Sequence, residues 1–331
     1  MAITIKELAA AAKVSVATVS RALNDDPKVR PETKKRVKHF ADLLDYNPNI
    51  LARNFKKGTS NIIGLILPDI YGEFFTEIIR GVDAVCYEHG YYPLVASSHS
   101  ERSMAETMIN FMGQGIVGGY IVMAPVLSDD LKSIIQKKNL PIVLINGRMT
   151  YEDCDSVGVD NQASAKAMVT HLIEKGYKRI AHISGSKKNN DATRREKGYV
   201  AALEEQGIAV DKKMIKSGDF DIVKGEQICR EFLSSKNKPD AIFCANDMMA
   251  IGCYKAAATM GFKIPEDIAI AGFDDIFVSQ FMTPRLTTVR VDTELIGKTA
   301  ADLLIKRIAE SQISSFSKIV IPSTIIDGES S

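Results

Sequence analysis

The chain has 331 residues, a length that predicts two or three domains. Of these residues 45% are hydrophobic and 25% are charged, as is typical of a soluble globular protein. No run approaches the roughly 18 apolar residues of a membrane span. Lys6 and Glu7 stand where a signal peptide needs its apolar core, so we expect a cytoplasmic protein. The five cysteines form no C-x-x-C pair and the histidines lack metal-ligand spacing, which predicts free thiols and no metal site.

The distribution of charge is more informative than the net charge of +1. Residues 1–58 contain 12 Lys or Arg and 6 Asp or Glu, a net charge of +6, so the remainder carries +1 − 6 = −5. A basic head on an acidic body predicts an arm that binds a polyanion, and a merely solvated basic face is the alternative.

The first 48 residues predict three short helices. Thr4 and Glu7 form a capping box for the first helix, and Ser15 can cap a second that runs to about Leu23. The third helix, in "RPETKKRVKHFADLLDY", has Pro31 at its first position. Because about four residues separate the first two helices, the pattern indicates a helix-turn-helix unit, although other small bundles share a bare three-helix pattern.

The second helix, "SVATVSRALN", has a polar face that suits DNA. Small side chains at its start let the backbone approach the major groove, and Arg21 can reach a guanine edge or a phosphate. Ser15, Thr18, Ser20 and the amides of the helix N-terminus suit phosphate oxygens.

The segments "TIKELAAAAKVSVATVSRALNDDPKVRPETKKRV" and "YNPNILARNFKKGTSNIIGLILPD" closely resemble the N-terminus of the LacI/GalR family of bacterial transcription regulators. The motifs "VS-x-x-TVSR-x-LN" and "NPN-x-x-AR" carry this resemblance, which continues along the whole chain. It implies that Val16 and Ala17 occupy the variable base-reading positions, Arg21 that of the base-contacting arginine, and Lys28 a position near bases. Phosphate-contacting positions fall on Thr18, Ser20, Asn24, Thr33 and Tyr46, and the implied DNA surface also includes Thr4, Asn49, Ala52, Phe55 and Lys56. Arg30 departs from the family, which often has a serine cap there.

The segment "NPNILARNFKKG" links the head to the rest of the chain. Residues Asn49–Lys57 fall short of the roughly 12–15 residues that an isolated helix needs. The resemblance implies a hinge helix that orders in the minor groove of operator DNA, pairs with its twin and inserts Phe55 where relatives commonly place leucine. A flexible linker with an incidental phenylalanine is the alternative. We therefore predict a helix-turn-helix domain over 1–48, a hinge over 49–60 and an effector-binding and dimerisation domain over 61–331.

Beyond residue 60, apolar runs alternate with amphipathic segments. Buried parallel strands are expected in "IIGLILPD", "YYPLVASS", "GGYIVMAP", "PIVLIN", "RIAHISG", "DAIFCAN" and "IAIAGFDD", and helices over 74–89, 161–175, 190–206 and 247–260. This pattern predicts an α/β fold with two doubly wound lobes, 61–160 and 161–290, and "LTTVRVD" and "IVIPSTII" indicate that the chain recrosses between them. The resemblance implies the same periplasmic-binding-protein-like core.

Polar and aromatic residues follow the predicted strands, where open α/β sheets bind ligands. The family resemblance strengthens the assignment of Arg195, Asn246 and Asp274 as effector contacts. It also implies that Phe220, placed at the end of a short strand, is a stacking aromatic. Asp247 and Asp275 are as well explained as helix caps. The full predicted effector site consists of Phe74, Phe75, Ser98, Asn146, Arg148, Arg195, Phe220, Asn246 and Asp274.

Two properties of the effector and the chemistry follow. Several cationic side chains are expected near the cleft or its rim: His99, Arg148, Lys187, Lys188, Arg194 and Arg195. They favour an acidic sugar derivative as the effector, and a rim of solvated cations is an equal alternative. The chain has no G-x-G-x-x-G after a strand and no G-x-S-x-G, and "IGKT" lacks the glycines of a phosphate-binding loop, so we expect neither an enzyme nor a cofactor.

We therefore expect a repressor that binds a palindromic operator as a homodimer and responds to a small effector, a sugar or an acidic sugar derivative, in the interlobe cleft. The chain ends in "IIDGESS" without heptads, which favours a dimer over a tetramer. A regulator that answers to a corepressor protein stays open as the alternative within the family. A sugar receptor without DNA activity and an α/β enzyme with a DNA-binding head are the alternatives outside it.

Overall fold

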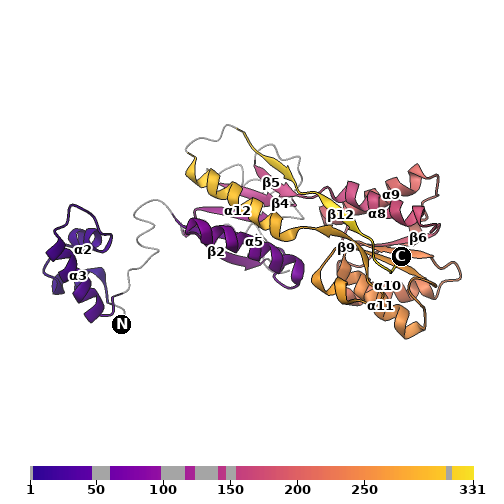
Figure 1. Ribbon diagram of the computed structural model, residues 1–331, viewed down its shortest axis with the longest axis horizontal. Helices are drawn as coiled ribbons and strands as arrows, with labels where there is room; N and C mark the ends of the chain where they lie inside the picture. The colour runs from indigo at the N-terminus through magenta and orange to yellow at the C-terminus, as the bar shows by residue number, and fades with distance from the viewer. Residues whose placement is uncertain (1–2, 47–59, 98–115, 124–140, 147–153, 311–314) are drawn as a thin grey trace. The chain divides into compact units, whose positions relative to one another are not determined.

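The computed structural model describes residues 3–46, 60–97, 116–123, 141–146, 154–310 and 315–331. The chain divides into two compact units, Met1–Ser60 and Asn61–Ser331 (Figure 1). The predicted hinge over 49–60 lies almost wholly outside the described residues.

The N-terminal unit contains the three predicted helices, α1 (Ile5–Ala11), α2 (Val16–Leu23) and α3 (Pro31–Leu43). Their caps are those predicted: Thr4 and Glu7 form the capping box, and the Ser15 hydroxyl accepts from the Thr18 amide at 3.1 Å. Arg30 supplies no side-chain cap to α3. A small core of buried side chains holds the helices together and comprises Leu8, Ala9, Ala12, Val19, Ala22, Val29, Val37 and Ala41.

The second unit has two lobes, each built on a six-stranded sheet. The first sheet has the order β11-β5-β4-β3-β1-β2 and is parallel throughout. The second has the order β12-β10-β9-β8-β6-β7 and is parallel except for β12. The first sheet comprises β1 (Ile62–Leu67), β2 (Tyr92–Ser97), β3 (Gly119–Met123), β4 (Ile142–Ile145), β5 (Asp155–Gly158) and β11 (Lys318–Val320). The second comprises β6 (Ile180–Ser184), β7 (Ile215–Ser217), β8 (Ala241–Cys244), β9 (Ala269–Asp274), β10 (Thr287–Val291) and β12 (Ser323–Ile326).

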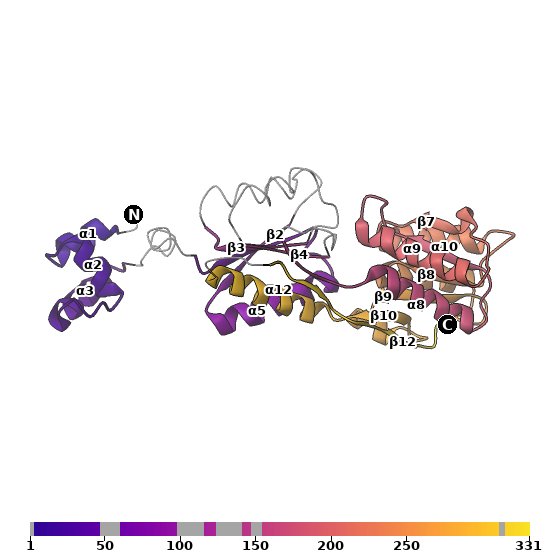
Figure 2. The same cartoon turned by 90° about the horizontal axis from the view of Figure 1, so that it is seen from above.

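Helices cover these sheets. In the first lobe, α5 (Glu73–His89) and α12 (Thr293–Ala309) lie side by side, as both views show (Figures 1 and 2). The second lobe has α8 (Asn161–Glu174), α9 (Asn190–Glu205), α10 (Ile222–Leu233) and α11 (Asp247–Met260), with the short 3-10 turns η1 (Lys212–Met214) and η2 (Phe277–Phe281).

The two faces of the second sheet bury different helices. Phe243 of β8 belongs to the core that α8 and α9 cover, whereas its neighbour Ile242 belongs to the core under α10 and α11. This alternation follows from the two-residue period of a strand. Helices α8 and α9 approach so closely that a Cβ at Gly198 would lie 2.3 Å from the Gln162 carbonyl oxygen.

The chain crosses between the lobes three times. It passes from β5 to α8, returns from β10 to α12, and crosses again from β11 to β12. The predicted doubly wound fold and the late recrossing are confirmed. The "IGKT" segment lies within α12, as an ordinary helix.

Two expectations about strands are wrong. The strand β2 lies at the edge of its sheet, so its residues, including Tyr92 and Val95, are exposed or half-buried and not fully buried. The strand β7 ends at Ser217, and Phe220 lies in the following turn with a φ of 62°.

Three further properties concern the described residues. All five cysteines are free and buried. No described helix is long and apolar enough to cross a bilayer. The described part of the chain holds no cluster of three or more metal-ligating side chains.

Candidate functional site

A cavity of about 490 Å³ lies where strands of both lobes end. In each sheet the chain adds one strand on one side of an inner strand, β1 in the first lobe and β6 in the second, and then continues on the other side of that strand. Ligands bind beyond the carboxyl ends of the strands at such a point. The lining comes from segments that follow β1, β3, β6, β7, β8 and β9. It consists of Pro68, Asp69, Tyr71, Gly72, Glu73, Phe74, Phe75, Met123, Asn189, Asp191, Arg195, Asp219, Phe220, Asp221, Ile222, Asn246, Met248, Asp274 and Ile276.

The structure brings six of the nine predicted effector residues together in this lining, namely Phe74, Phe75, Arg195, Phe220, Asn246 and Asp274. Asn146 is not part of the described lining. It is buried directly after β4 with a φ of 51°, and its side chain approaches Asp191 closely enough to lower the pKa of that carboxyl. Ser98 and Arg148 lie outside the described residues, as does His99.

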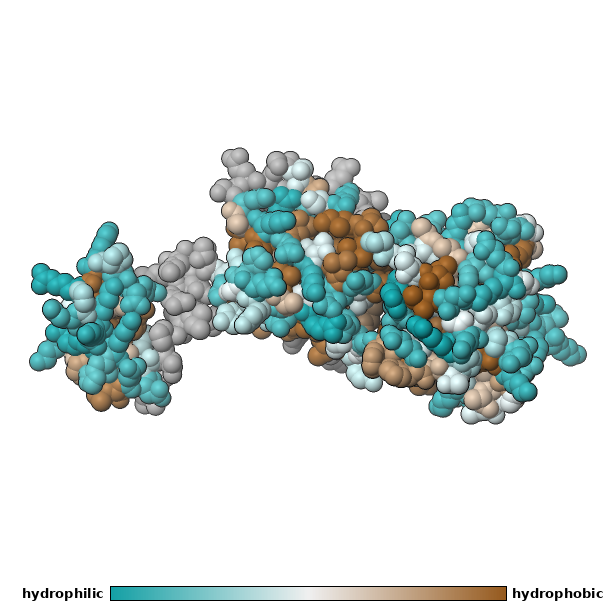
Figure 3. Space-filling view, in the orientation of Figure 1, coloured by the Kyte–Doolittle hydropathy of each residue, from teal (hydrophilic) through white to brown (hydrophobic). Residues whose placement is uncertain are grey.

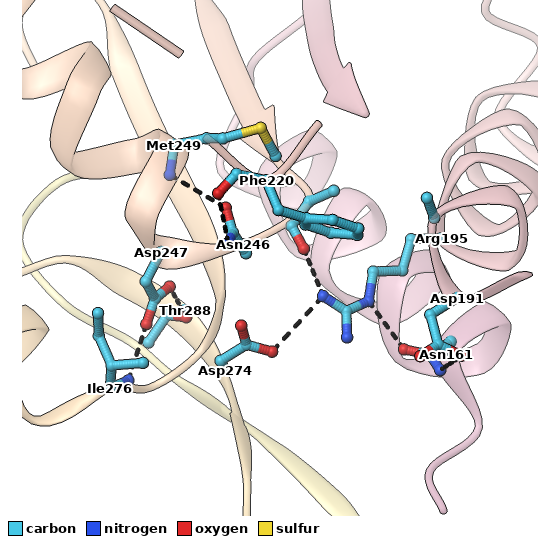
Figure 4. Close-up of polar contacts among 12 residues, drawn as sticks. Asn161, Asp191, Arg195, Phe220, Asn246, Asp247, Met249, Asp274, Ile276 and Thr288 are labelled. Carbon is cyan, nitrogen blue, oxygen red and sulfur yellow. Dashed lines mark hydrogen bonds and ion pairs between the residues drawn. The ribbon is translucent and has the colours of Figure 1, made fainter. Parts of the chain in front are cut away.

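Arg195 lies at the floor of the cavity and is only 3% exposed. Its Nε donates to Asn161 Oδ1 at 2.8 Å, and its Nη1 donates to the Ala245 carbonyl oxygen and lies 3.5 Å from Asp274 Oδ1 (Figure 4). The guanidinium carbon lies 3.6 Å from the centroid of the Phe273 ring, a cation–π contact. Elements far apart in sequence therefore fix this side chain, and within the described chain only Nη2 has no hydrogen-bond partner.

Two carboxyl groups accompany the guanidinium. Burial raises the pKa of Asp274 to about 7 and that of Asp191 to about 6, and in both cases the charge of Arg195 opposes the rise. Asp191 is 5% exposed and accepts from Asn161 Nδ2 at 3.1 Å. Perturbed carboxyl groups in a cleft are typical of a functional site.

Asn246, and not Asp247, caps α11. The Asn246 Oδ1 accepts from the Met249 amide at 3.0 Å, and its Nδ2 lies 3.4 Å from the Phe220 carbonyl oxygen. Asp247 is fully buried, and it accepts from Thr288 Oγ1 at 2.6 Å and from the Ile276 amide at 2.9 Å.

Asp275 does not cap the 3-10 turn η2 that follows it, because Ile276 is the cap residue there. Its carboxylate accepts from Arg290 Nε at 2.6 Å and from the Ser279 hydroxyl at 3.3 Å. The interpretation of Asp247 and Asp275 as caps is therefore wrong, and neither residue belongs to the described lining of the cavity.

Asp191 is the main residue that the sequence reasoning missed. It lies four residues before Arg195 on α9, so both side chains share one face of that helix. That spacing, in the first turn of a helix that follows β6, was the signal available in the sequence.

The N-terminal unit places its predicted DNA-binding residues in two groups. Thr4, Ser15, Ala17, Arg21, Asn24 and Lys28 are exposed, and Val16, Thr18, Ser20, Thr33 and Tyr46 are half-buried. Val16 and Tyr46 also pack against the small helical core. On the face shown in Figure 3, hydrophilic side chains cover most of this unit. Asn49, Ala52, Phe55 and Lys56 lie outside the described residues.

A basic helix-turn-helix unit on the same chain as a two-lobed binding core defines a transcriptional regulator that binds DNA. Two family models match the chain: "Bacterial regulatory proteins, lacI family" over residues 4–49 and "Periplasmic binding protein-like domain" over residues 169–331. The chain belongs to the LacI family of bacterial regulatory proteins.

Three relatives illustrate the match. The HTH-type transcriptional repressor CytR of Escherichia coli (strain K12) is 36% identical over 99% of this chain and 96% of its own length. The transcriptional regulator CelR in complex with cellobiose is 28% identical, with a TM-score of 0.75 over 99% of this chain and 100% of its own. The lac repressor dimer bound to operator and the anti-inducer ONPF is 24% identical and has a TM-score of 0.86 over 100% of this chain and 99% of its own, which supports the fold.

Proposed function

We propose that this regulator is a dimeric repressor whose affinity for a palindromic operator is controlled by a small molecule in the interlobe cavity. The convergence of Arg195, Asp274 and Phe220 on one cavity carries this proposal, because the same chain bears a helix-turn-helix unit. A ligand that contacts both lobes changes the angle between them, which in a dimer alters the spacing of two heads. Such coupling between sites is typically about 1–3 kcal/mol.

The DNA surface of the proposal centres on α2. Ala17 and Arg21 are exposed on this helix, Lys28 is exposed just beyond it, and Ser15 and Thr18 stand at its N-terminus. Arginine donates two parallel hydrogen bonds to guanine, and hydroxyl groups at a helix N-terminus suit phosphates. The hinge role of Asn49, Ala52, Phe55 and Lys56 stays a prediction.

For the effector, the described lining supports a sugar-type ligand better than an acidic one. It carries six carboxyl side chains and one cation, Arg195, whereas Lys187, Lys188 and Arg194 are not among the described residues that line it. Carboxylates accept from hydroxyl groups, and the rings of Phe74, Phe75 and Phe220 can cover the apolar face of a sugar ring. The cellobiose complex of the relative CelR agrees with this class. No observation on the described residues favours a corepressor protein instead.

Selection of binding sites from random duplex DNA tests the regulator as a full-length chain. We expect a palindromic site, and we expect Arg21→Ala to abolish its preference over random DNA. Arg21→Lys is the matched control, because it keeps the phosphate-attracting charge but loses the bidentate fork. It should therefore retain salt-dependent binding with reduced selectivity. Recovery of no palindromic site, or full selectivity in both variants, would contradict the proposal.

A further inference from the structure

Asp247 carries a fully buried carboxyl group next to the cavity, and it has no role in the proposed function. It follows Asn246, which lines the cavity and caps α11, but it does not itself belong to the described lining. Its two oxygens each accept one hydrogen bond, Oδ1 from the Thr288 hydroxyl at 2.6 Å and Oδ2 from the Ile276 amide at 2.9 Å (Figure 4). The carboxyl group therefore joins three elements: the start of α11, the strand β10 and the loop after β9.

Both partners of Asp247 belong to connections between the lobes. Thr288 lies on β10, which leads directly across to α12 of the first lobe. Ile276 directly precedes Phe277, whose amide donates to the Glu73 carboxylate at the start of α5 in the first lobe. One carboxyl group thus holds both the strand that crosses to the first lobe and the loop that contacts it.

The loop is in a conformation that has to be held. Asp274 and Asp275, which directly precede Ile276, have φ angles of 114° and 56°. Such backbone angles are unfavourable for residues other than glycine and persist only where surrounding contacts impose them. Arg290 of β10 holds the Asp275 carboxylate at 2.6 Å, and Asp247 holds the Ile276 amide. Without the Asp247 acceptor, we expect the loop to relax toward an easier conformation.

The surroundings of Asp247 are shaped for its carboxyl group, although burial there is unfavourable. A Cβ at Gly272 of β9 would lie 2.1 Å from Asp247 Oδ1, so glycine leaves the room that the carboxyl occupies. Burial, and after it the charge of Asp274, raises the pKa of Asp247 well above its usual range. In the described part of the chain no cation is among the groups that shift this pKa. A buried acid without a counter-charge usually lowers stability, so its presence is explained by the two donors that it holds.

We propose that Asp247 is a positioning residue that makes the loop Asp274–Phe277 and the strand β10 a single unit, so that the second-lobe wall of the cavity and the contact with Glu73 are formed or lost together. Asp247 acts without touching a ligand. The inference deepens the proposed function, because it names a residue through which the cavity and the lobe contact are joined. It rests on that function only for the statement that a ligand in the cavity acts on Asp274.

Hydrogen exchange of the full chain, without ligand or DNA, tests whether the two contacts open together. Asp247→Leu keeps the branched shape but removes both acceptors, so the Ile276 amide should exchange about ten-fold faster. The Phe277 amide, which donates to Glu73 and not to Asp247, should also exchange faster, by about three-fold or more. In the reverse direction, Glu73→Ala should accelerate exchange of the Ile276 amide, because coupling between two contacts is reciprocal. Changes confined to the amide whose own acceptor was removed would overturn the proposal.

Two variants separate positioning from general stabilisation. Asp247→Asn can still accept from the Ile276 amide and can donate to the Thr288 hydroxyl, so exchange at both loop amides should return to within about three-fold of the unsubstituted chain. The matched control is Asp240→Asn, because the Asp240 carboxylate also accepts from two backbone amides of the second lobe, at 2.8 and 2.9 Å. It should leave exchange at Ile276 and Phe277 unchanged.

The amides of the core strand β8 report on the whole lobe. If Asp247→Leu accelerates their exchange as much as that of Phe277, the residue merely stabilises the lobe and the assignment fails. Should Asp247→Leu not fold, the Glu73→Ala arm decides, since an unchanged Ile276 amide in that variant refutes the coupling.

Thr288→Val tests the connection to β10. It keeps the size of the side chain but removes the hydroxyl that donates to Asp247, so we expect faster exchange at both Ile276 and Phe277. An unchanged exchange rate at both amides would overturn the inclusion of β10 in the unit. If the loop amides respond as expected but no ligand alters operator affinity, the proposed function fails and this inference stands.

Discussion

Glu73 connects the two lobes through a single hydrogen bond, and its removal is expected to loosen that contact. Glu73 is the first residue of α5 in the first lobe, and its carboxylate accepts from the backbone amide of Phe277, where η2 begins in the second lobe. Hydrogen bonds to a charged group contribute about 1.5–3 kcal/mol. Glu73 is half-buried, so we take the lower end, about 1.5 kcal/mol, or roughly ten-fold in an equilibrium constant.

Hydrogen exchange at the Phe277 amide measures this contact without any ligand. Glu73→Ala should raise the exchange rate of that amide about ten-fold, because the open state becomes more populated. Glu73→Gln should have a smaller effect, since its amide oxygen can still accept. The matched control is Glu77→Ala, one turn further along α5, where the carboxylate pairs with Arg80 at 2.5 Å. An unchanged exchange rate in Glu73→Ala, or an equal rise in both alanine variants, would refute the reasoning.

Three other substitutions have expected outcomes. Gly198→Ala places a Cβ 2.3 Å from the Gln162 carbonyl oxygen, so overpacking should destabilise the second unit by about 1–3 kcal/mol, and an unchanged melting temperature would contradict this. Arg307→Met leaves the buried Asp155 without its bidentate partner, whose nitrogens lie at 2.7 and 2.9 Å, and should cost about 3–5 kcal/mol in thermal unfolding, much of it recovered by also replacing Asp155 with leucine. Phe55→Ala should weaken operator binding by about 1–3 kcal/mol, while equal weakening on random DNA would exclude a wedge role.

The helices could be predicted from sequence because local signals define them. The helix expected over 247–260 is observed as Asp247–Met260, with Asn246 as its cap and Gly261 in a left-handed conformation at its end. The capping box at Thr4 and the cap at Ser15 likewise lie where the sequence indicated. Such signals involve residues at most four apart, so no tertiary information is needed.

The errors concern properties that depend on distant neighbours. Whether a strand is buried depends on its place in the sheet, and the apolar sequence of β2 does not reveal that it lies at an edge. The charge of the cavity, which the sequence left open between an acidic effector and a solvated cationic rim, depends on distant neighbours in the same way. Only the fold determines which charged side chains converge on the cavity. The partners of Arg195 come from α8, from the residue after β8 and from the end of β9.

The loop Asp274–Phe277 explains how occupancy of the cavity can act on both lobes. Asp274 faces Arg195 in the cavity, and the next three residues are each held from another element: Asp275 by Arg290 of β10, the Ile276 amide by Asp247, and the Phe277 amide by Glu73 of α5. Asp274 and Asp275 have φ angles of 114° and 56°, which non-glycine residues adopt only when surrounding contacts impose them.

Because β10 leads directly across to α12, a displacement of this loop acts on a strand that crosses between the lobes and, through Glu73, on the start of α5. Phe74 and Phe75, which line the cavity, follow Glu73 on that helix. A ligand that contacts both Asp274 and the phenylalanines would therefore hold the two lobes together beside the place where the Glu73 hydrogen bond joins them. We therefore expect ligand binding and the lobe contact to stabilise each other. A ligand that fills the cavity should slow exchange of the Phe277 amide, and Glu73→Ala should weaken binding of that ligand by the same factor.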